Sequence, residues 1–361
     1  MQRVKVNEKS FEGQPIYVGI DYHKKSWKVT VLGKEYEHKS MSRDPDPDQL
    51  VSYLKSHFPG ADYKAVYEAG FSGFRSQRRL KELGVDCIVI HAADVPTSEK
   101  DRQQKTDKAD SRKLAKMLRS GEFAGVHVPD EELETGRALV RQRYRISKDL
   151  TRHKNRVKSL LFQFGIEIPE RFTDSQSRGW SGNYMEWLKE LPEGREELRA
   201  VVRNYVETGM QVRKQLTAIT RQVRVLSKKE RYRRDYELLV SIPGIGLLVG
   251  MFLLTQLGNL GRFKSLDELC SYVGLMPRMH GSGEKMVTGK LSRRGRKEIK
   301  IMLIEAAWIA VRQDPAMTVR FNGLKKRMNA NKAIIRIAKN LLSRIRYVIR
   351  HQTAYEPGVI K

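Results

Sequence analysis

Four carboxylates stand where this chain could bind a metal ion. Asp21 and Glu68 each directly follow an apolar run that we expect to form a strand. Asp107 and Asp110 lie three residues apart at the start of an expected helix, which places both on one helix face. Carboxylate oxygens bind hard cations, and two such ions about 4 Å apart stabilise the attacking and leaving oxygens of phosphoryl transfer. From the residues alone, solvated acids that merely cap a helix or favour its dipole remain the alternative.

The elements that would position these acids form an α/β domain at residues 1–128, which we expect to hold a mixed sheet with helices packed on it. Apolar or alternating runs predict strands at Ile16–Ile20, Trp27–Leu32, Tyr36–Lys39, Tyr63–Tyr67 and Cys87–Ile90. Asp46 followed by Pro47 is typical of a helix start, and that helix should run through His57. Further helices are expected at Ser72–Leu83 and Ala109–Leu118.

A second reactive group is possible at Ser282, which stands between Gly281 and Gly283 in a segment that we expect to be a loop, Gly274–Lys290. Flanking glycines let a backbone approach a phosphate closely. Nearby cations could stabilise a pentavalent phosphate, and they are Arg278, Lys285, Lys290, Arg293 and Arg294. A nucleophilic serine needs an activating base. None is obvious nearby, so the activator could be the acidic site, and a plain loop is the alternative.

Two helical regions follow the first domain, at residues 129–232 and 233–361. In the first, Leu198–Leu226 carries apolar residues spaced alternately by four and three, broken only by Gly209. This seam predicts a coiled coil, formed either with the expected helix Leu133–Phe164 or between subunits, and an ordinary amphipathic helix is the alternative. The helix Leu133–Phe164 is strongly basic, and we expect nucleic-acid backbone contacts from Arg137, Arg141, Arg145, Lys148, Arg152 and Arg156.

The last region is expected to be mainly α-helical. Ser241–Gly246 resembles the turn of a helix-hairpin-helix, in which backbone N–H groups near Gly244 and Gly246 could bind a DNA phosphate without reading sequence. A buried hairpin turn is the alternative. Helices are expected on both sides of this turn, up to Ile242 and over Leu247–Leu257, and later at Lys297–Val311 and Ala330–Ile349.

The charge of the chain points to a polyanionic partner. The 361 residues include 69 Lys and Arg against 42 Asp and Glu, a net charge of +27, and nucleic acid is the expected partner. No apolar run approaches the roughly 18 residues of a membrane span, so no membrane partner is expected. The chain has only two cysteines, far apart in sequence, which excludes a disulfide framework and a zinc site. We expect a bacterial cytoplasmic, nucleoid-associated location.

Three segments carry a resemblance to a known family: Val18–Asp21, Tyr67–Gly70 and Lys105–Asp110. They look like the four-acid signature of the DEDD-type insertion-sequence transposases, a family that includes Piv-type DNA invertases and RNA-guided bridge recombinases. Gly274–Gly283 followed by Ser292–Gly295 resembles the serine motif of the same family. Tyr22-His23-Lys24 departs from the small residues that the family pattern favours after its first acid.

This resemblance implies an RNase H-like first domain, similar to Holliday-junction resolvases, in which Asp21, Glu68, Asp107 and Asp110 bind Mg²⁺. It implies that Ser282 attacks DNA and forms a phosphoserine link. It further implies DNA partners at the element ends and target, a structured guide RNA, and a homodimer or homotetramer. The helical arm around Leu198–Leu226 predicts that the acids and Ser282 combine across subunits.

Two other functions remain open from the sequence. The first is a metal-dependent junction resolvase that hydrolyses DNA and uses Ser282 only structurally. The second is a non-catalytic nucleic-acid-binding scaffold, which would fit the charge and the helical seam but would leave the four acids without a role.

Overall fold

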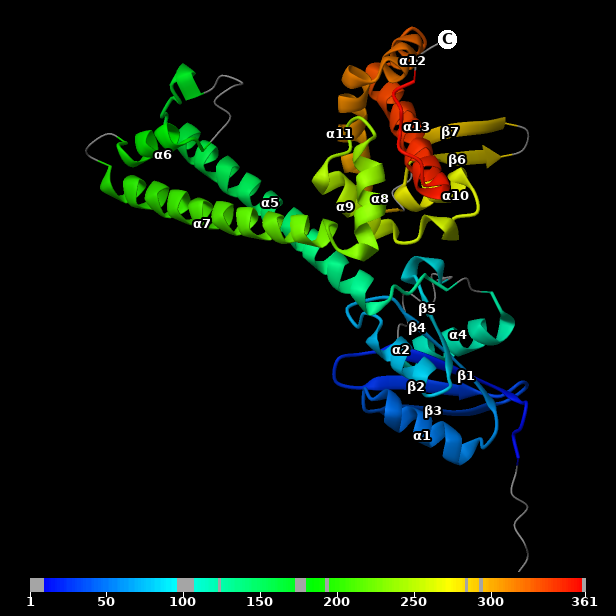
Figure 1. Ribbon diagram of the computed structural model, residues 1–361. Coiled ribbons are helices and arrows are strands. Elements are labelled where there is room, and N and C mark those ends of the chain that lie inside the picture. The colour runs from blue at the N-terminus through cyan, green and yellow to red at the C-terminus, as the bar shows by residue number, and fades with distance from the viewer. Residues whose placement is uncertain are drawn as a thin grey trace, which may run out of the picture. The chain divides into compact units, whose positions relative to one another are not determined.

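The computed structural model describes residues 10–95, 107–122, 125–172, 180–191, 195–282, 285–291 and 295–358, with backbone alone at 107–108, 278–282, 285–288 and 290. The chain divides into two compact units, Met1–Pro129 and Asp130–Lys361 (Figure 1). The first is a mixed α/β unit and the second is mostly helical, which confirms the predicted fold class at this level.

The first unit is built on a five-stranded sheet of order β3-β2-β1-β4-β5. The strands are β1 (Pro15–Tyr22), β2 (Trp27–Leu32), β3 (Glu37–Arg43), β4 (Asp62–Glu68) and β5 (Asp86–Ile90). The pairs β1–β2 and β2–β3 are antiparallel, whereas β4 pairs parallel with β1 and β5 pairs parallel with β4. Parallel strands require crossovers, which here contain the helices α1 (Pro47–His57) and α2 (Arg75–Glu82). All five strands were predicted, with β3 longer than expected.

The helices cover both faces of this sheet. One face packs its alternating apolar residues, Ile16, Val18 and Ile20 among them, against Leu50 and Leu54 of α1. The other face is covered by α4 (Asp107–Ser120), whose Leu114 packs on Val66 and Ile90. Asp46 caps α1 as predicted, because its carboxylate accepts a hydrogen bond from Asp48 N at 2.9 Å. The period-two pattern of the strands therefore produces a three-layer unit.

Glycine 19 allows α4 to lie unusually close to β1. A Cβ atom built at this position would be 2.1 Å from the carbonyl oxygen of Ser111 and 2.5 Å from Ala115 N. The buried hydroxyl of Thr30, which is opposite Gly19 in the β1–β2 register, lies 2.8 Å from Ser111 Oγ. Gly19 and Thr30 together fix the first turns of α4 on the two central antiparallel strands.

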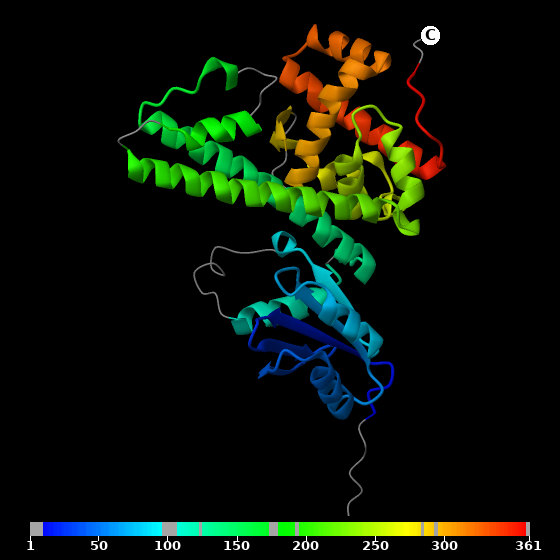
Figure 2. The ribbon, with the colours of Figure 1, turned by 60° about the vertical axis from the view of Figure 1, so that its left-hand side comes forward.

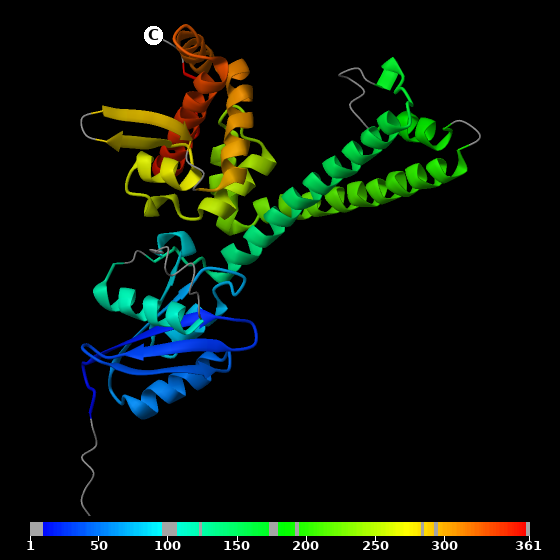
Figure 3. The ribbon, with the colours of Figure 1, turned by 180° about the vertical axis from the view of Figure 1, so that it is seen from behind.

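The second unit begins with two long helices, α5 (Glu131–Gln163) and α7 (Glu196–Ser227). They run side by side in all three ribbon views, with the short α6 (Gly182–Lys189) near their far end (Figures 1 to 3). The seam of α7 therefore packs on α5 within the chain, one of the two arrangements that the sequence left open. Gly209 breaks the seam because the Trp180 ring occupies its place, 1.9 Å from where a Cβ would stand.

The remaining elements of this unit pack around the base of α5 and α7. They are α8 (Glu230–Val240), α9 (Leu247–Leu257), a short 3-10 turn at Leu260–Arg262, α10 (Leu266–Val273), β6 (Pro277–Ser282), β7 (Lys285–Leu291), α11 (Lys297–Gln313), α12 (Pro315–Lys325) and α13 (Ala330–His351). Two other 3-10 turns are Ala92–Asp94, after β5 in the first unit, and Glu170–Phe172, between α5 and α6. One apolar core joins Leu133 and Val140 of α5 and Val223 of α7 to these helices. Regions 129–232 and 233–361 therefore share a core.

The segment Gly274–Lys290 is not the loop that the sequence predicted. Its residues form most of an antiparallel two-stranded sheet, β6 and β7, in which Ser282 pairs with Lys285. Proline, glycine and serine in this segment are rare in strands, and this is the reason that the pattern favoured a loop. No helix among the described residues is both long enough and apolar enough to cross a lipid bilayer.

We predict that Gly19→Ala destabilises the first unit by about 3 kcal/mol, because a Cβ cannot fit against the α4 backbone without moving it. Chemical denaturation of the full chain would measure this loss. Gly70→Ala is the matched control, since nothing lies within 4 Å of a Cβ at that position. Equal stability of the two variants would contradict the role given to Gly19.

Candidate active site

Two of the four acids predicted from the sequence lie on adjacent strands at the same edge of the sheet. Asp21 lies near the end of β1 and Glu68 ends β4. The parallel register pairs Ile20 with Tyr67, so Asp21 and Glu68 occupy the next positions along the two strands. Both side chains are half-buried, which leaves part of each accessible to a ligand.

The other two acids belong to the first turn of α4, which begins at Asp107 and contains Asp110. Asp110 is half-buried and directly precedes Ser111, the residue whose backbone lies against Gly19. Since Gly19 is only two residues before Asp21, the contact that packs α4 on β1 also brings Asp110 to the part of β1 that carries Asp21. Of Asp107 the structure describes the backbone alone.

Sequence reasoning missed the structural roles of two residues that follow Asp21 in the chain, Tyr22 and His23. His23 Nε2 lies 3.0 Å from Asp21 Oδ2, so this histidine holds one carboxylate oxygen. Tyr22 packs its ring 5.5 Å from that of Tyr67 and 5.9 Å from that of Phe71, and its hydroxyl lies 3.0 Å from Ser76 Oγ. The departure from small residues at these two positions was the available signal, because a histidine beside an acid can orient it.

The donor set fits a hard divalent cation. Carboxylate oxygens from two strand ends and a helix turn are the ligands that Mg²⁺ uses in proteins. Within the residues that the structure describes, which exclude the Asp107 side chain, no three Asp, Glu, His or Cys side chains already stand together as a metal site. The structure therefore places Asp21 and Glu68 at one edge of the sheet. That all four acids together bind the metal stays a prediction.

Ser282 is the last residue of β6, directly before the turn of the hairpin. Both ends of the hairpin are fixed by glycines: Gly274 ends α10 with φ +85° and Gly295 has φ +108°. A Cβ at Gly295 would be 2.7 Å from Gly274 N, so the two ends of the hairpin lie against each other. Arg278 lies in β6, and Lys285 and Lys290 lie in β7. Ser292, Arg293 and Arg294 are outside the described residues.

The basic residues of α5 fall into two groups. Arg137 is only 8% exposed, and its Nε donates to the carbonyl oxygen of Thr255 at 2.9 Å. Arg141 is half-buried, and its Nε donates to Gln256 Oε1 at 2.8 Å. This burial argues against the expected role of Arg137 in nucleic-acid contact, because its guanidinium joins α5 to α9. The exposed group is Arg145, Lys148, Arg152 and Arg156.

The turn that resembles a helix-hairpin-helix combines a half-buried and an exposed glycine. Gly244 has φ +90°, and a Cβ there would be 2.3 Å from the carbonyl oxygen of Ala306. It therefore packs this turn against α11. Gly246, by contrast, is exposed at the N-terminus of α9 with nothing within 4 Å of a Cβ position. Only the Gly246 side of the turn is open to a phosphate.

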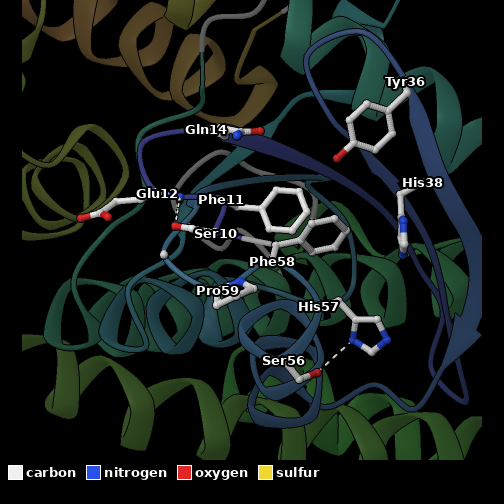
Figure 4. A pocket seen from close by; sticks show the side chains of 11 residues that line it. Ser10, Phe11, Glu12, Gln14, Tyr36, His38, Ser56, His57, Phe58 and Pro59 are labelled. Atoms are coloured by element: carbon white, nitrogen blue, oxygen red, sulfur yellow. Dashed lines mark hydrogen bonds between the residues drawn. The ribbon is translucent and has the colours of Figure 1, made fainter. Parts of the chain in front are cut away.

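A cavity of about 1100 Å³ lies at the end of the sheet opposite the acids (Figure 4). In the close-up the Phe11 and Phe58 rings pack edge to face, and Ser56 contacts His57. The cavity is lined by Ser10, Phe11, Glu12, Gln14, Tyr36, His38, Ser56, His57, Phe58, Pro59 and Gly60. Because Gln14 precedes β1 and Asp21 lies near its other end, this cavity is no part of the acidic site.

Comparison with known proteins gives the same functional class for both units. Residues 18–166 match the DEDD transposase family of IS110 elements, and residues 236–322 match the transposase family IS116/IS110/IS902. A transposase for insertion sequence element IS1533 of Leptospira borgpetersenii is 26% identical over 304 residues, 81% of this chain and 84% of that protein. A Sinorhizobium fredii protein, y4qE, which is named as a transposase, is 29% identical over 245 residues. The match covers 67% of this chain and 57% of that protein.

The sheet edge with its acids and the two family matches define a DEDD-type DNA transposase. More closely, the chain belongs to the IS110/IS116 family of insertion-sequence transposases. The match over residues 18–166 includes Asp21, Glu68 and Asp110, the three expected acids whose side chains the structure describes. A transposase binds DNA, in agreement with the net charge of +27.

We predict that Thr30→Val weakens the hold of the sheet on α4. The change removes a hydroxyl that contacts both Ser111 and Ser40 at 2.8 Å, and it should cost about 1–2 kcal/mol of unfolding free energy because the Ser111 contact is buried. Ser40→Ala is the control, since it leaves the Thr30–Ser111 contact in place. Thermal unfolding of both variants measures their loss of stability. An equal loss in Thr30→Val and Ser40→Ala would show that the contact of Thr30 with α4 is unimportant.

Proposed function

We propose that this transposase cuts and rejoins DNA strands through a covalent phosphoserine at Ser282, with Mg²⁺ held by Asp21, Glu68, Asp107 and Asp110. The observation that carries the proposal is the register that sets Asp21 and Glu68 side by side, with the first turn of α4 against the same strand. The match to the DEDD family supports an RNase H-like fold for the first unit, to which the strand order of the sheet is suited.

In this proposal Ser282 Oγ attacks a backbone phosphorus, and the bond from that phosphorus to a deoxyribose oxygen breaks. The serine proton passes to a carboxylate of the acidic site, and the departing oxygen takes up a proton. Mg²⁺, when bound, would stabilise the negative charge that develops on the phosphate oxygens. Because the phosphoserine conserves the bond energy, a new strand can be joined by the reverse of this step, which suits recombination better than hydrolysis.

A structured guide RNA and DNA are the proposed partners of the exposed basic face of α5. Arg145, Lys148, Arg152 and Arg156 recur at three- and four-residue intervals and share one helix face. Such a face attracts phosphates without reading bases, which fits a recombinase whose sequence choice is delegated to RNA. We further propose a dimer or tetramer in which Ser282 of one subunit acts with the acids of another.

We predict that the protein, its element's non-coding RNA, Mg²⁺ and labelled junction DNA give a covalent protein–DNA adduct on a denaturing gel. Ser282→Ala and Asp21→Asn should each abolish it, because the first removes the nucleophile and the second a metal ligand. Ser271→Ala, an exposed serine of α10, is the matched control and should keep the adduct.

Cleaved DNA without an adduct, unaffected by Ser282→Ala, would instead identify a hydrolytic resolvase. Mixing the two inactive variants tests the arrangement across subunits. If Ser282 and the acids combine between subunits, some mixed assemblies contain one intact site and regain part of the adduct. No recovery in stable mixed assemblies would place both halves in one chain.

Divalent-metal binding provides a separate prediction that does not depend on DNA. Glu68→Gln should weaken Mg²⁺ or Mn²⁺ affinity at least tenfold, about 1.4 kcal/mol, because it removes a charged ligand. Asp62→Asn is the control, since Asp62 is an exposed acid at the opposite end of the same strand. Calorimetry on the full chain would measure both. Unchanged affinity in Glu68→Gln would exclude Glu68 as a ligand.

A further inference from the structure

The second unit gathers four arginines around one tyrosine, Tyr272 of α10. The Cζ atom of Arg262 lies 4.7 Å from the centre of the Tyr272 ring, and that of Arg296 lies 5.7 Å from it. Arg137 and Arg141 approach from α5, where their side chains reach α9. Within the part of the chain that the structure describes, none of these four arginines forms an ion pair with a carboxylate.

The cluster carries strong positive charge in a partly buried place. Burial, together with the charges of Arg296 and Arg137, lowers the pKa of Arg141 to about 10. Burial also lowers the pKa of Arg137, with Arg296 and Arg262 acting in the same direction. Burial by itself would raise the pKa of Tyr272, but the charges of Arg296, Arg262 and Arg137 outweigh it and lower that pKa. The arginines therefore act on one another and on Tyr272 as neighbouring positive charges, while Tyr272 and Glu134 raise the pKa of Arg137.

The Arg262 side chain is firmly positioned, and Arg296 is joined to Tyr272 through its backbone. Arg262 donates from Nε to the carbonyl oxygen of Leu257 at 3.2 Å, and its Cζ atom lies 4.1 Å from the centre of the Phe263 ring. The backbone N–H of Arg296 donates to the carbonyl oxygen of Tyr272 at 3.2 Å. The Arg262 guanidinium, held in this way, loses little freedom when it binds an anion, so this part of the cluster is organised before any ligand arrives.

We propose that Arg141, Arg262 and Arg296, with the hydroxyl of Tyr272, bind a backbone phosphate of nucleic acid at the base of the β6–β7 hairpin. A phosphate supplies the negative charge that the cluster lacks and accepts several charge-assisted hydrogen bonds at once. Arg137, which is the most buried of the four, acts as a positioning residue that adds charge from below.

The surroundings of the cluster favour nucleic acid over a small anion. Arg141 lies on the same face of α5 as the exposed residues Arg145, Lys148, Arg152 and Arg156, and the charge of Arg145 also lowers its pKa. A nucleic-acid strand that follows this face of α5 would reach the arginine cluster at the end of the face where Arg141 lies. Since Gly295 and Gly274 bring the two ends of the hairpin together beside Tyr272, the bound phosphate would lie at the base of the β6–β7 hairpin, whose first strand ends with Ser282 (Figure 3).

The direct test is the titration of Tyr272 in the full chain. The absorbance of its phenolate is obtained as wild type minus Tyr272→Phe across pH, with and without saturating oligonucleotide. A bound phosphate neutralises the arginines that favour the phenolate, so the pKa of Tyr272 should rise. Single-stranded DNA, duplex DNA and RNA of equal length are compared, and the largest rise identifies the nucleic acid. No rise with any of them would overturn the proposal, as would an equal rise with pyrophosphate alone.

A second measurement uses the dependence of oligonucleotide affinity on salt. Arg141→Gln should reduce the slope of log K against log salt by about one, because one phosphate contact is lost. Arg320→Gln, an exposed arginine of α12, makes the same charge change elsewhere and should leave the slope unchanged. Arg141→Lys should retain most of the slope. Identical slopes for Arg141→Gln and Arg320→Gln would contradict the site.

This inference rests on the proposed function only in assuming that the phosphate belongs to nucleic acid. The two can fail separately. An adduct at Ser282 with an unchanged Tyr272 titration would reject the phosphate site alone. A raised Tyr272 pKa without any adduct would reject strand transfer and keep the site.

Discussion

The acidic site depends on one close contact, in which the backbone of α4 lies directly on β1 at Gly19. Any side chain at this position would push the helix away, because a Cβ would already stand 2.1 Å from the Ser111 carbonyl oxygen. The strand fixes Asp21 two residues later, and the helix fixes Asp110 one residue before Ser111. A missing side chain thus sets the spacing between two elements that each contribute acids to one edge of the sheet, and Thr30 holds that spacing by its buried hydrogen bond.

The second unit uses glycine in the same manner at three other places. The Trp180 ring, which precedes α6, packs on Gly209 of α7. The backbone of α11 packs on Gly244, and the end of α10 packs on Gly295. The latter two also have positive φ angles, which side-chain-bearing residues rarely adopt. These contacts determine where the hairpin of Ser282 and the turn before α9 stand. In both units, then, the elements of the proposed chemistry are positioned by backbone contacts that only glycine permits.

Much of this arrangement could be predicted from local pattern, and the exceptions have a common cause. The strands of the first unit follow from period-two burial, and their acids follow from the ends of those strands. The β6–β7 hairpin could not be predicted, because its residues have poor strand propensity and its pairing partner lies across a turn. The helices α6, α10 and α12 were not predicted individually, because each buries only two or three residues and so shows little apolar periodicity. The role of Gly209 was likewise hidden, since the sequence shows a break in the seam but not the tryptophan that fills it.

The net charge of the chain shows the same limit of sequence reasoning most clearly. Arg137, Arg141 and Arg145 are spaced by four along α5, so they share a helix face and were indistinguishable as nucleic-acid contacts. The structure separates them, because α9 covers the base of this face and leaves the rest exposed. A guanidinium in the covered part loses solvation and gains carbonyl partners, whereas one beyond it keeps its water until a phosphate displaces it. Arg141 stands at the boundary between these two environments. A partly buried cation at this position is costly without an anion and strongly favourable with one. One helix face thus changes from residues that pack the core to residues that can bind phosphate, and Arg141 places positive charge where a nucleic-acid strand would reach the base of the hairpin.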